Sequence, residues 1–355
     1  MTDSPESGGT SPILQVDDLV VRFRGGGRVV RAVNSVSFSV YAGETVGIVG
    51  ESGSGKTVTM LSILGLLPSP PAEVMSGTAR LFGEDLLAAS PSRLRELRGQ
   101  KVAMVFQDPM TSLNPVIKVG EQIREAIWVH DRDGSKVDHM ARVVELLDLV
   151  GVPQPARRAK QYPHEFSGGM RQRAMIAMAI ANNPVLLVAD EPTTALDVTI
   201  QAQVIDVLME AKRASGAATV LVTHDLGIVS EIADRVIVMY AGRIVEQGPT
   251  AALFAQPRHP YTIGLLASLP SIDARQSRLY SIPGQPPNLA DVPSGCPFRT
   301  RCAVGRTRTR CSTEQPELIP VEIGHAVACH YLDDVAAWAE SDPFREDEPI
   351  SGAAP

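Results

Sequence analysis

The chain has 355 residues, of which 44% are hydrophobic and 21% are charged, and its formal net charge at pH 7 is -7. This length exceeds the usual size of one compact domain, so we expect one large domain with an appended region. The apolar content excludes a mainly disordered chain, and the acidic balance argues against a protein that grips nucleic acid through a global positive field.

The first ten residues, MTDSPESGGT, lack the basic start and apolar stretch of a secretion signal. No run of residues approaches the roughly 18 consecutive apolar positions of a membrane span. We therefore expect a protein that stays in a reducing compartment, where structural disulfides are rare. We also expect a disordered N-terminus at residues 1–12 and a flexible tail at residues 341–355.

Apolar runs alternate with helical periodicity along residues 13–256. Strands are expected at 13–23, 32–40, 44–49, 102–106, 184–189, 218–223 and 235–240. Helices are expected at 58–66, 119–130, 136–149, 170–181, 200–214 and 226–233. This alternation favours an α/β domain with a largely parallel sheet. After residue 256 prolines become frequent and periodicity fades, apart from a short helix at 261–268, which predicts a loop-rich C-terminal region.

Residues 50–57 read GESGSGKT and match the phosphate-loop pattern G-x-x-x-x-G-K-[ST] between a predicted strand and a predicted helix. Backbone amides of such a loop, together with the helix N-terminus, bind nucleotide phosphates. Lys56 would bridge the β- and γ-phosphates, and the Thr57 hydroxyl would bind Mg²⁺. The loop residues expected to contact ATP are Gly50, Ser52, Gly53, Ser54, Gly55, Lys56 and Thr57.

The apolar run at 185–189 ends on two carboxylates, Asp190 and Glu191. The carboxyl ends of strands are where parallel α/β sheets bind ligands. Asp190 would hold Mg²⁺ through water, and Glu191 would orient and deprotonate the attacking water as general base.

Ser167, Gly168 and Gly169 open a predicted helix within YPHEFSGGMRQR, and a serine cap with glycines again makes an anion site. Together with the phosphate loop and the two carboxylates, the segment resembles the signature of the ATP-binding cassette family. This signature has the form L-S-G-G-Q and is FSGGM in this chain. The resemblance covers about residues 13–256. It implies a P-loop NTPase cassette with a RecA-like α/β core, an antiparallel β subdomain and a helical subdomain at about 108–170.

Further positions match motifs of that family in the expected order. The resemblance implies that Phe23 lies under the adenine ring, that Gln107 contacts Mg²⁺ and water, and that His224 touches the γ-phosphate. Asp197, at the end of TALD, would look across a dimer. The catalytic residues so implied are Lys56, Gln107, Glu191 and His224, and the Mg²⁺ ligands are Thr57, Gln107 and Asp190.

In this family two cassettes sandwich each nucleotide, so that the phosphate loop of one faces the Ser-Gly-Gly segment of the other. Since the chain has one copy of each motif, the resemblance implies a second ATPase subunit, with a heterodimer favoured over a homodimer. It also implies two transmembrane permease subunits and an extracellular or periplasmic substrate-binding protein. The chain would then be a peripheral subunit on the cytoplasmic face of the membrane, without a nucleic acid partner.

Residues 257–340 resemble the C-terminal region of oligopeptide and dipeptide importer ATPases, through HPYTIGLLASLP, SIPGQPPNLADVPSGCPFRTRC and HAVACH. The resemblance implies an ATPase that drives peptide uptake. Import of nickel, glutathione, sugar or another small solute is an alternative. A soluble cassette ATPase without a transport role is a more distant alternative.

All four cysteines, Cys296, Cys302, Cys311 and Cys329, lie in this region with the spacing C-x₅-C-x₈-C-x₁₇-C. The close C-x₂-C pairs of a zinc ribbon are absent, and four thiolates on irregular loops suit a [4Fe-4S] cluster. Some importer ATPases of this type resemble iron-sulfur proteins here. We therefore expect a [4Fe-4S] cluster, with zinc and unmetallated thiols as alternatives. His325 and His330 are alternative ligands, and the arginines between residues 299 and 310 would offset the charge of the thiolates or face the partner cassette.

Overall fold

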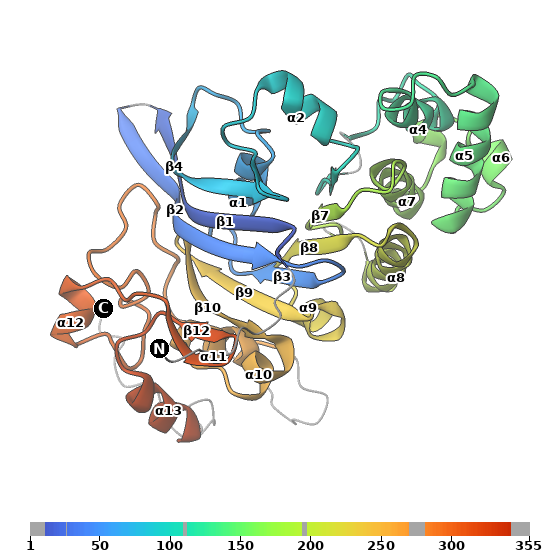
Figure 1. Ribbon diagram of the computed structural model, residues 1–355. Helices are drawn as coiled ribbons and strands as arrows, with labels where there is room; N and C mark the ends of the chain where they lie inside the picture. Colours follow the sequence, from blue (N-terminus) through green and yellow to red (C-terminus); the bar gives the residue numbers. More distant parts are fainter. Residues whose placement is uncertain (1–10, 26, 109–111, 194–196, 270–280, 342–355) are drawn as a thin grey trace, which may run out of the picture.

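Figure 1 shows a computed structural model, which describes residues 11–25, 27–108, 112–193, 197–269 and 281–341. Most of the termini that were expected to be disordered or flexible, residues 1–10 and 342–355, lie outside this set. The described chain forms two β-sheets with helices packed around them (Figure 1). The α/β class and the parallel core predicted from the sequence are confirmed.

The smaller sheet is antiparallel and comes from the first quarter of the chain. Its strands are β1 (Leu14–Gly25), β2 (Arg28–Val40), β4 (Ala72–Leu81) and β5 (Glu84–Asp85), in the order β2-β1-β4-β5. Burial alternates along β1, with Leu14 and Val16 buried before a register shift and Leu19 and Val21 buried after it. This alternation is typical of an antiparallel sheet that covers a core with one face.

The larger sheet has eight strands and contains the parallel core. The five parallel strands are β3 (Thr45–Val49), β6 (Val102–Val105), β7 (Leu186–Asp190), β8 (Ala218–Thr223) and β9 (Arg235–Tyr240), in the spatial order β9-β3-β8-β7-β6. Every residue of β3, β7 and β8 is buried. Strands covered on both faces read as continuous apolar runs, which is why their positions are evident in the sequence.

Helices follow these strands. They are α1 (Lys56–Ile63), α2 (Pro91–Leu97), α4 (Val119–Trp128), α5 (Lys136–Leu149), α6 (Pro155–Arg158), α7 (Gly168–Ala179), α8 (Val198–Ser215), α9 (Leu226–Ile232), α10 (Thr250–Ala255), α11 (Pro260–Ala267), α12 (Thr309–Thr313) and α13 (Leu332–Glu340). Figure 1 shows α4, α5 and α6 grouped at one end of the molecule. All three lie within residues 108–170, the range predicted for a helical subdomain. None of the helices in the described ranges is both long enough and apolar enough to span a bilayer.

The C-terminal region extends the core sheet. The strand β10 (Arg243–Pro249) pairs antiparallel with β9 on one side and with β12 (His325–Val327) on the other, and β11 (Ile319–Glu322) follows at the edge. Ile282, Phe298 and Cys302 belong to the same hydrophobic cluster as the core strands. The region predicted to be loop-rich therefore also supplies two strands, and its side chains pack into the core of the cassette.

Candidate nucleotide site

The phosphate loop lies between β3 and α1, as the sequence predicted. Gly55 has φ +101°, and a Cβ at this position would collide with the carbonyl oxygen of Ala32 on β2, so only glycine fits here. The Lys56 side chain is buried, and its Nζ donates hydrogen bonds to the carbonyl oxygens of Gly50 (2.7 Å) and Glu51 (3.1 Å). Burial lowers the pKa of Lys56. The lysine is thus held along the inner side of the loop.

A cavity of about 570 Å³ opens beside the phosphate loop, which is a volume typical of small-molecule sites. Its lining residues are Ala32, Ser52, Gly53, Ser54, Gly55, Lys56, Thr57, Val58, Gln107, Glu191, His224 and Leu289. The cavity therefore gathers the loop and the three polar side chains that the sequence placed in catalysis. Leu289 comes from the C-terminal region, which sequence reasoning did not place at this site.

Three polar side chains meet at the carboxyl ends of adjacent strands. Gln107 follows β6, Glu191 follows β7 and His224 follows β8. Gln107 Nε2 donates a hydrogen bond of 3.1 Å to Glu191 Oε2, and His224 Nδ1 lies 3.6 Å from the same oxygen. Glu191 has φ +44°, an uncommon value for a residue other than glycine, and such conformations concentrate at functional sites. The sequence prediction that these three residues share one site agrees with this geometry.

Asp190, the last residue of β7, faces the phosphate loop. Its Oδ1 accepts a hydrogen bond of 2.9 Å from the Thr57 hydroxyl. The carboxyl group is buried, and this burial raises the pKa of Asp190. A buried carboxylate beside a hydroxyl at the phosphate-binding edge is a donor set that suits Mg²⁺, which prefers oxygen ligands.

Other predicted site residues lie away from this cavity. Ser167 caps α7 by accepting a hydrogen bond from the Met170 amide (3.3 Å), and both Ser167 and Gly168 are exposed. Asp197 caps α8 in the same way and is also exposed.

None of Ser167, Gly168, Gly169 and Asp197 lines the cavity of its own chain. Thr194, Ala195 and Leu196, the remaining residues of the predicted D-loop, lie outside the described residues.

Phe23 is not among the residues that line the cavity either. It lies on β1, opposite Val30 of β2 and Ala72 of β4, and packs partly buried against the core beneath the antiparallel sheet. Its contact with the adenine ring stays a prediction.

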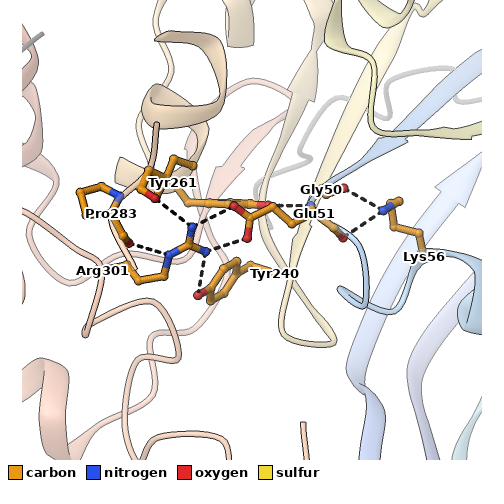
Figure 2. Close-up of polar contacts among 8 residues, drawn as sticks. Gly50, Glu51, Lys56, Tyr240, Tyr261, Pro283 and Arg301 are labelled. Carbon is orange, nitrogen blue, oxygen red and sulfur yellow. Dashed lines mark hydrogen bonds and ion pairs between the residues drawn. The ribbon is translucent and has the colours of Figure 1, made fainter. Parts of the chain in front are cut away.

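Sequence reasoning missed the contact between the phosphate loop and the C-terminal region. The Arg301 guanidinium pairs with the Glu51 carboxylate at 2.6 and 2.9 Å (Figure 2). The sequence had suggested that arginines in this region offset thiolate charge or face a partner cassette. For Arg301 the structure corrects this expectation, since its partner is a carboxylate of the same chain. No local pattern signals a pair whose members are 250 positions apart.

The four cysteines come together in the C-terminal region. All of them line one small cavity of about 20 Å³, together with Gly305 and His330. Burial raises the pKa of Cys296 to about 12 and that of Cys329 to about 11.

Backbone amides donate to two of these sulfur atoms, Gly305 N to Cys302 Sγ at 3.1 Å and Tyr331 N to Cys329 Sγ at 3.5 Å. A Cβ on Gly305 would approach Cys311 Sγ to 2.9 Å, so a glycine leaves the space between the thiols open.

The two histidines proposed as alternative ligands have other partners. His325 Nε2 lies 2.9 Å from Glu246 Oε1 in a fully buried pair, and His330 Nε2 lies 3.0 Å from the carbonyl oxygen of Glu314. Across the described ranges, no three side chains of histidine, cysteine, aspartate or glutamate converge closely enough to hold a single metal ion.

Comparison with known protein families gives two matches along the chain. The ABC transporter family model matches residues 33–194, and the model of the oligopeptide/dipeptide transporter C-terminal region matches residues 245–311. The second match includes three of the four cysteines and Arg301.

Two relatives are similar over most of the chain. The chain is 50% identical over 336 residues to the oligopeptide transport ATP-binding protein OppD of Mycobacterium tuberculosis, which covers 94% of this chain and 54% of that protein. It is 51% identical over 323 residues to the dipeptide transport ATP-binding protein DppD of Escherichia coli, which covers 91% of this chain and 98% of that protein. The chain thus spans about half the length of the mycobacterial relative and nearly all of the other.

Solved structures share the fold. A dimeric structure of the ATP-binding cassette MJ0796, in a post-hydrolysis state bound to ADP and Pi, matches with a TM-score of 0.60 and 26% identity, covering 67% of this chain and 98% of that chain. The structure of cbiO1 from Clostridium perfringens, part of the transporter complex cbiONQ, matches with a TM-score of 0.59 and 25% identity, covering 70% of this chain and 92% of that chain.

Proposed function

Because this chain belongs to the ATP-binding cassette (ABC) transporter family, we propose that it is the ATP-hydrolysing subunit of an importer that carries di- or oligopeptides across the cytoplasmic membrane. The observation that carries the ATPase assignment is the meeting of Gln107, Glu191 and His224 beside the phosphate loop. The peptide substrate is supported by the match of the C-terminal region and by the names of the relatives.

We propose the following roles for the polar side chains at this cavity. Lys56 and the loop amides bind the phosphates, and Thr57, Asp190 and Gln107 would hold Mg²⁺, which neutralises phosphate charge when bound. Glu191 accepts the proton of the attacking water as general base. Gln107 and His224 contact the same carboxylate oxygen, so they orient this base, and His224 would reach the γ-phosphate.

The substitution Glu191→Gln tests this assignment in the assembled transporter. The amide keeps the shape of the side chain and cannot accept the proton, so we expect ATP binding to persist and hydrolysis to fall by about a hundredfold or more. The exposed Glu231→Gln on α9 is the matched control and should leave turnover unchanged. An unchanged turnover rate in Glu191→Gln would overturn the general-base role.

We propose that a membrane subunit docks at the apolar groove between the core sheet and the helical group. This groove has a volume of about 300 Å³, and its lining includes Leu66, Phe106, Ala126, Met175 and Met178. Leu66 and Phe106 are large apolar side chains that stay exposed, as expected for a protein interface. Phe106 directly precedes Gln107, so a permease segment in this groove would lie one residue away from the side chain that contacts Glu191.

The remaining partners follow from the same family. We propose two permease subunits, an extracellular or periplasmic substrate-binding protein, and a peripheral position on the cytoplasmic face of the membrane. We also propose a second cassette in a heterodimer. Exposed Ser167 and Gly168 support the second cassette, because an anion site outside the chain's own cavity can serve the nucleotide of a partner.

We propose that the four cysteines hold a [4Fe-4S] cluster. The observation that supports it is that all four thiols line one cavity. The amides of Gly305 and Tyr331 point at sulfur atoms, as is common around such clusters. A bound cluster would keep the thiols as thiolates and tie together the irregular loops that carry them.

Anaerobic purification of the full chain tests this site. We expect a brown protein with iron and acid-labile sulfide in equal amounts, and loss of the colour in Cys311→Ser. A colourless protein with one zinc per chain would establish the zinc alternative. A colourless protein without metal would leave the unmetallated thiols.

A further inference from the structure

Glu51, the second residue of the phosphate loop, is held mainly by the C-terminal region (Figure 2). Its backbone N–H donates a hydrogen bond of 2.8 Å to the Tyr261 hydroxyl. Its carboxylate accepts from both terminal nitrogens of Arg301, at 2.6 and 2.9 Å. Its carbonyl oxygen accepts from Lys56 Nζ at 3.1 Å. A single residue therefore joins the phosphate-binding lysine to the region that carries the cysteines.

Every N–H of the Arg301 guanidinium has an acceptor. Nε donates to the Pro283 carbonyl oxygen (3.0 Å), Nη1 donates to Glu51 and to the Tyr240 hydroxyl (3.4 Å), and Nη2 donates to Glu51 and to the Ile282 carbonyl oxygen (3.4 Å). An arginine has five such donors in a rigid planar fork, and this pocket satisfies all of them. Only 4% of the Arg301 side chain is exposed.

Aromatic side chains enclose this ion pair. The rings of Tyr240 and Tyr261 lie 4.7 Å apart, and Phe298 lies 5.2 Å from Tyr240 in an edge-to-face contact. Arg301 Cζ lies 5.8 Å from the centre of the Tyr240 ring. Removing one partner from a buried ion pair leaves the other charge without compensation, which costs far more than the loss of a surface pair.

Arg301 also fixes a wall of the nucleotide cavity. The carbonyl oxygens of Ile282 and Pro283 bind its guanidinium, and the segment that begins there continues to Leu289, which lines the cavity. Between these points, Pro286, Pro287 and Asn288 face the phosphate loop across a second cavity of about 310 Å³.

We propose that Arg301 is a positioning residue of the nucleotide site, through which the C-terminal region sets the affinity of the phosphate loop for ATP. The inference rests on the proposed ATPase function. Without Arg301, the Glu51 carboxylate would attract Lys56, which lies five positions further along the chain, and would repel the phosphates that the loop binds. With Arg301, Glu51 is neutralised and Lys56 is available to the nucleotide.

Titration of the full chain with a fluorescent ATP analogue, in the presence of Mg²⁺, tests the proposal. Arg301→Ala is expected to weaken binding by about tenfold or more, because it leaves a partly buried carboxylate unpaired on the phosphate loop. The double variant Glu51→Gln/Arg301→Ala keeps neither charge of the pair, so it is expected to bind the analogue more tightly than Arg301→Ala and to recover most of the lost affinity. Arg306→Ala removes an exposed arginine of the same region and is the matched control.

Rescue separates positioning from a general loss of structure. If Arg301→Ala binds the analogue as well as the unaltered chain, or if adding Glu51→Gln to Arg301→Ala does not restore binding, the proposal is overturned. If Arg301→Ala does not fold, Arg301→Gln removes the charge while keeping an amide in the pocket and takes its place in the same comparison. Failure of the unaltered chain to bind, with no further effect of Lys56→Ala, would instead overturn the ATPase function and this inference with it.

Discussion

His259 precedes α11 and is a buried histidine that stays neutral. Its Nδ1 accepts a hydrogen bond of 3.1 Å from the Tyr261 amide, and its own amide donates to Glu246 Oε2 at 2.9 Å. Burial lowers the pKa of His259 to about 4, although the nearby Glu246 carboxylate opposes this shift. Protonation at Nδ1 would remove the acceptor that holds the first turn of α11, the helix that carries Tyr261.

The depressed pKa predicts a loss of stability in acid. In the unfolded chain His259 takes up a proton as the pH falls below about 6.5, whereas the folded chain resists protonation until about pH 4. The unfolded state therefore gains protons first, and the contribution of His259 to the free energy of unfolding falls across this window, by up to about 3 kcal/mol at its lower end. Above pH 6.5 the contribution is constant.

Urea unfolding between pH 7.5 and pH 5 measures this effect. The comparison is with His259→Asn, because an asparagine oxygen also accepts a hydrogen bond from a helix N-terminus and does not titrate. We expect the variant to lose less stability than the unaltered chain as the pH falls. Parallel curves for the two proteins would show that His259 is not the group responsible.

At the scale of elements, β10 attaches the C-terminal region through one buried carboxylate. Glu246 is fully buried and accepts hydrogen bonds from the amides of Arg258 and His259, and its Oε1 lies 2.9 Å from His325 Nε2 on β12. Three groups from the segments that follow the cassette therefore contact this carboxylate.

Glu246→Ala is predicted to destabilise the protein by about 3–5 kcal/mol, because it leaves buried donors without an acceptor. Chemical denaturation of the full chain measures the change. The control is Glu322→Ala on β11, which removes a half-exposed partner of Arg258 and should cost less than about 1 kcal/mol. Equal effects of the two substitutions would contradict the role assigned to Glu246.

The strands that could be predicted most directly from the sequence are those whose own residues form a recognisable apolar pattern, whichever strands pair with them. β3, β7 and β8 are uninterrupted apolar runs, and the expected strands at 44–49, 184–189 and 218–223 coincide with them within one or two residues. β10 was not predicted, because its sequence RIVEQGP contains Glu246, Gly248 and Pro249. It is a strand because β9 pairs with it in a hairpin and β12 pairs with it across about 80 positions, and the second pairing leaves no periodic pattern.

At the scale of the whole molecule, the site residues that could be predicted are those whose motifs directly follow strands of the parallel sheet. Lys56, Gln107, Glu191 and His224 each follow a strand of the parallel sheet, so strand order and motif order together place them at one edge. The Arg301–Glu51 pair was not predictable, since neither residue belongs to a periodic pattern and only the packing of the C-terminal region against the core brings them together.

Ser167 is exposed at the start of α7 and does not line the cavity of its own chain, so in the proposed dimer it would serve the nucleotide of the partner. We therefore predict that Ser167→Arg leaves the ATP affinity of the isolated chain unchanged and lowers ATP hydrolysis at the partner's site in the assembled transporter, by about tenfold or more if this anion site acts in the transition state. Ser135→Arg alters another exposed serine cap, that of α5, and should change neither quantity. Fluorescent nucleotide titration and phosphate release measure the two effects. A loss of ATP affinity in the isolated Ser167→Arg chain would instead place Ser167 in the site of its own subunit.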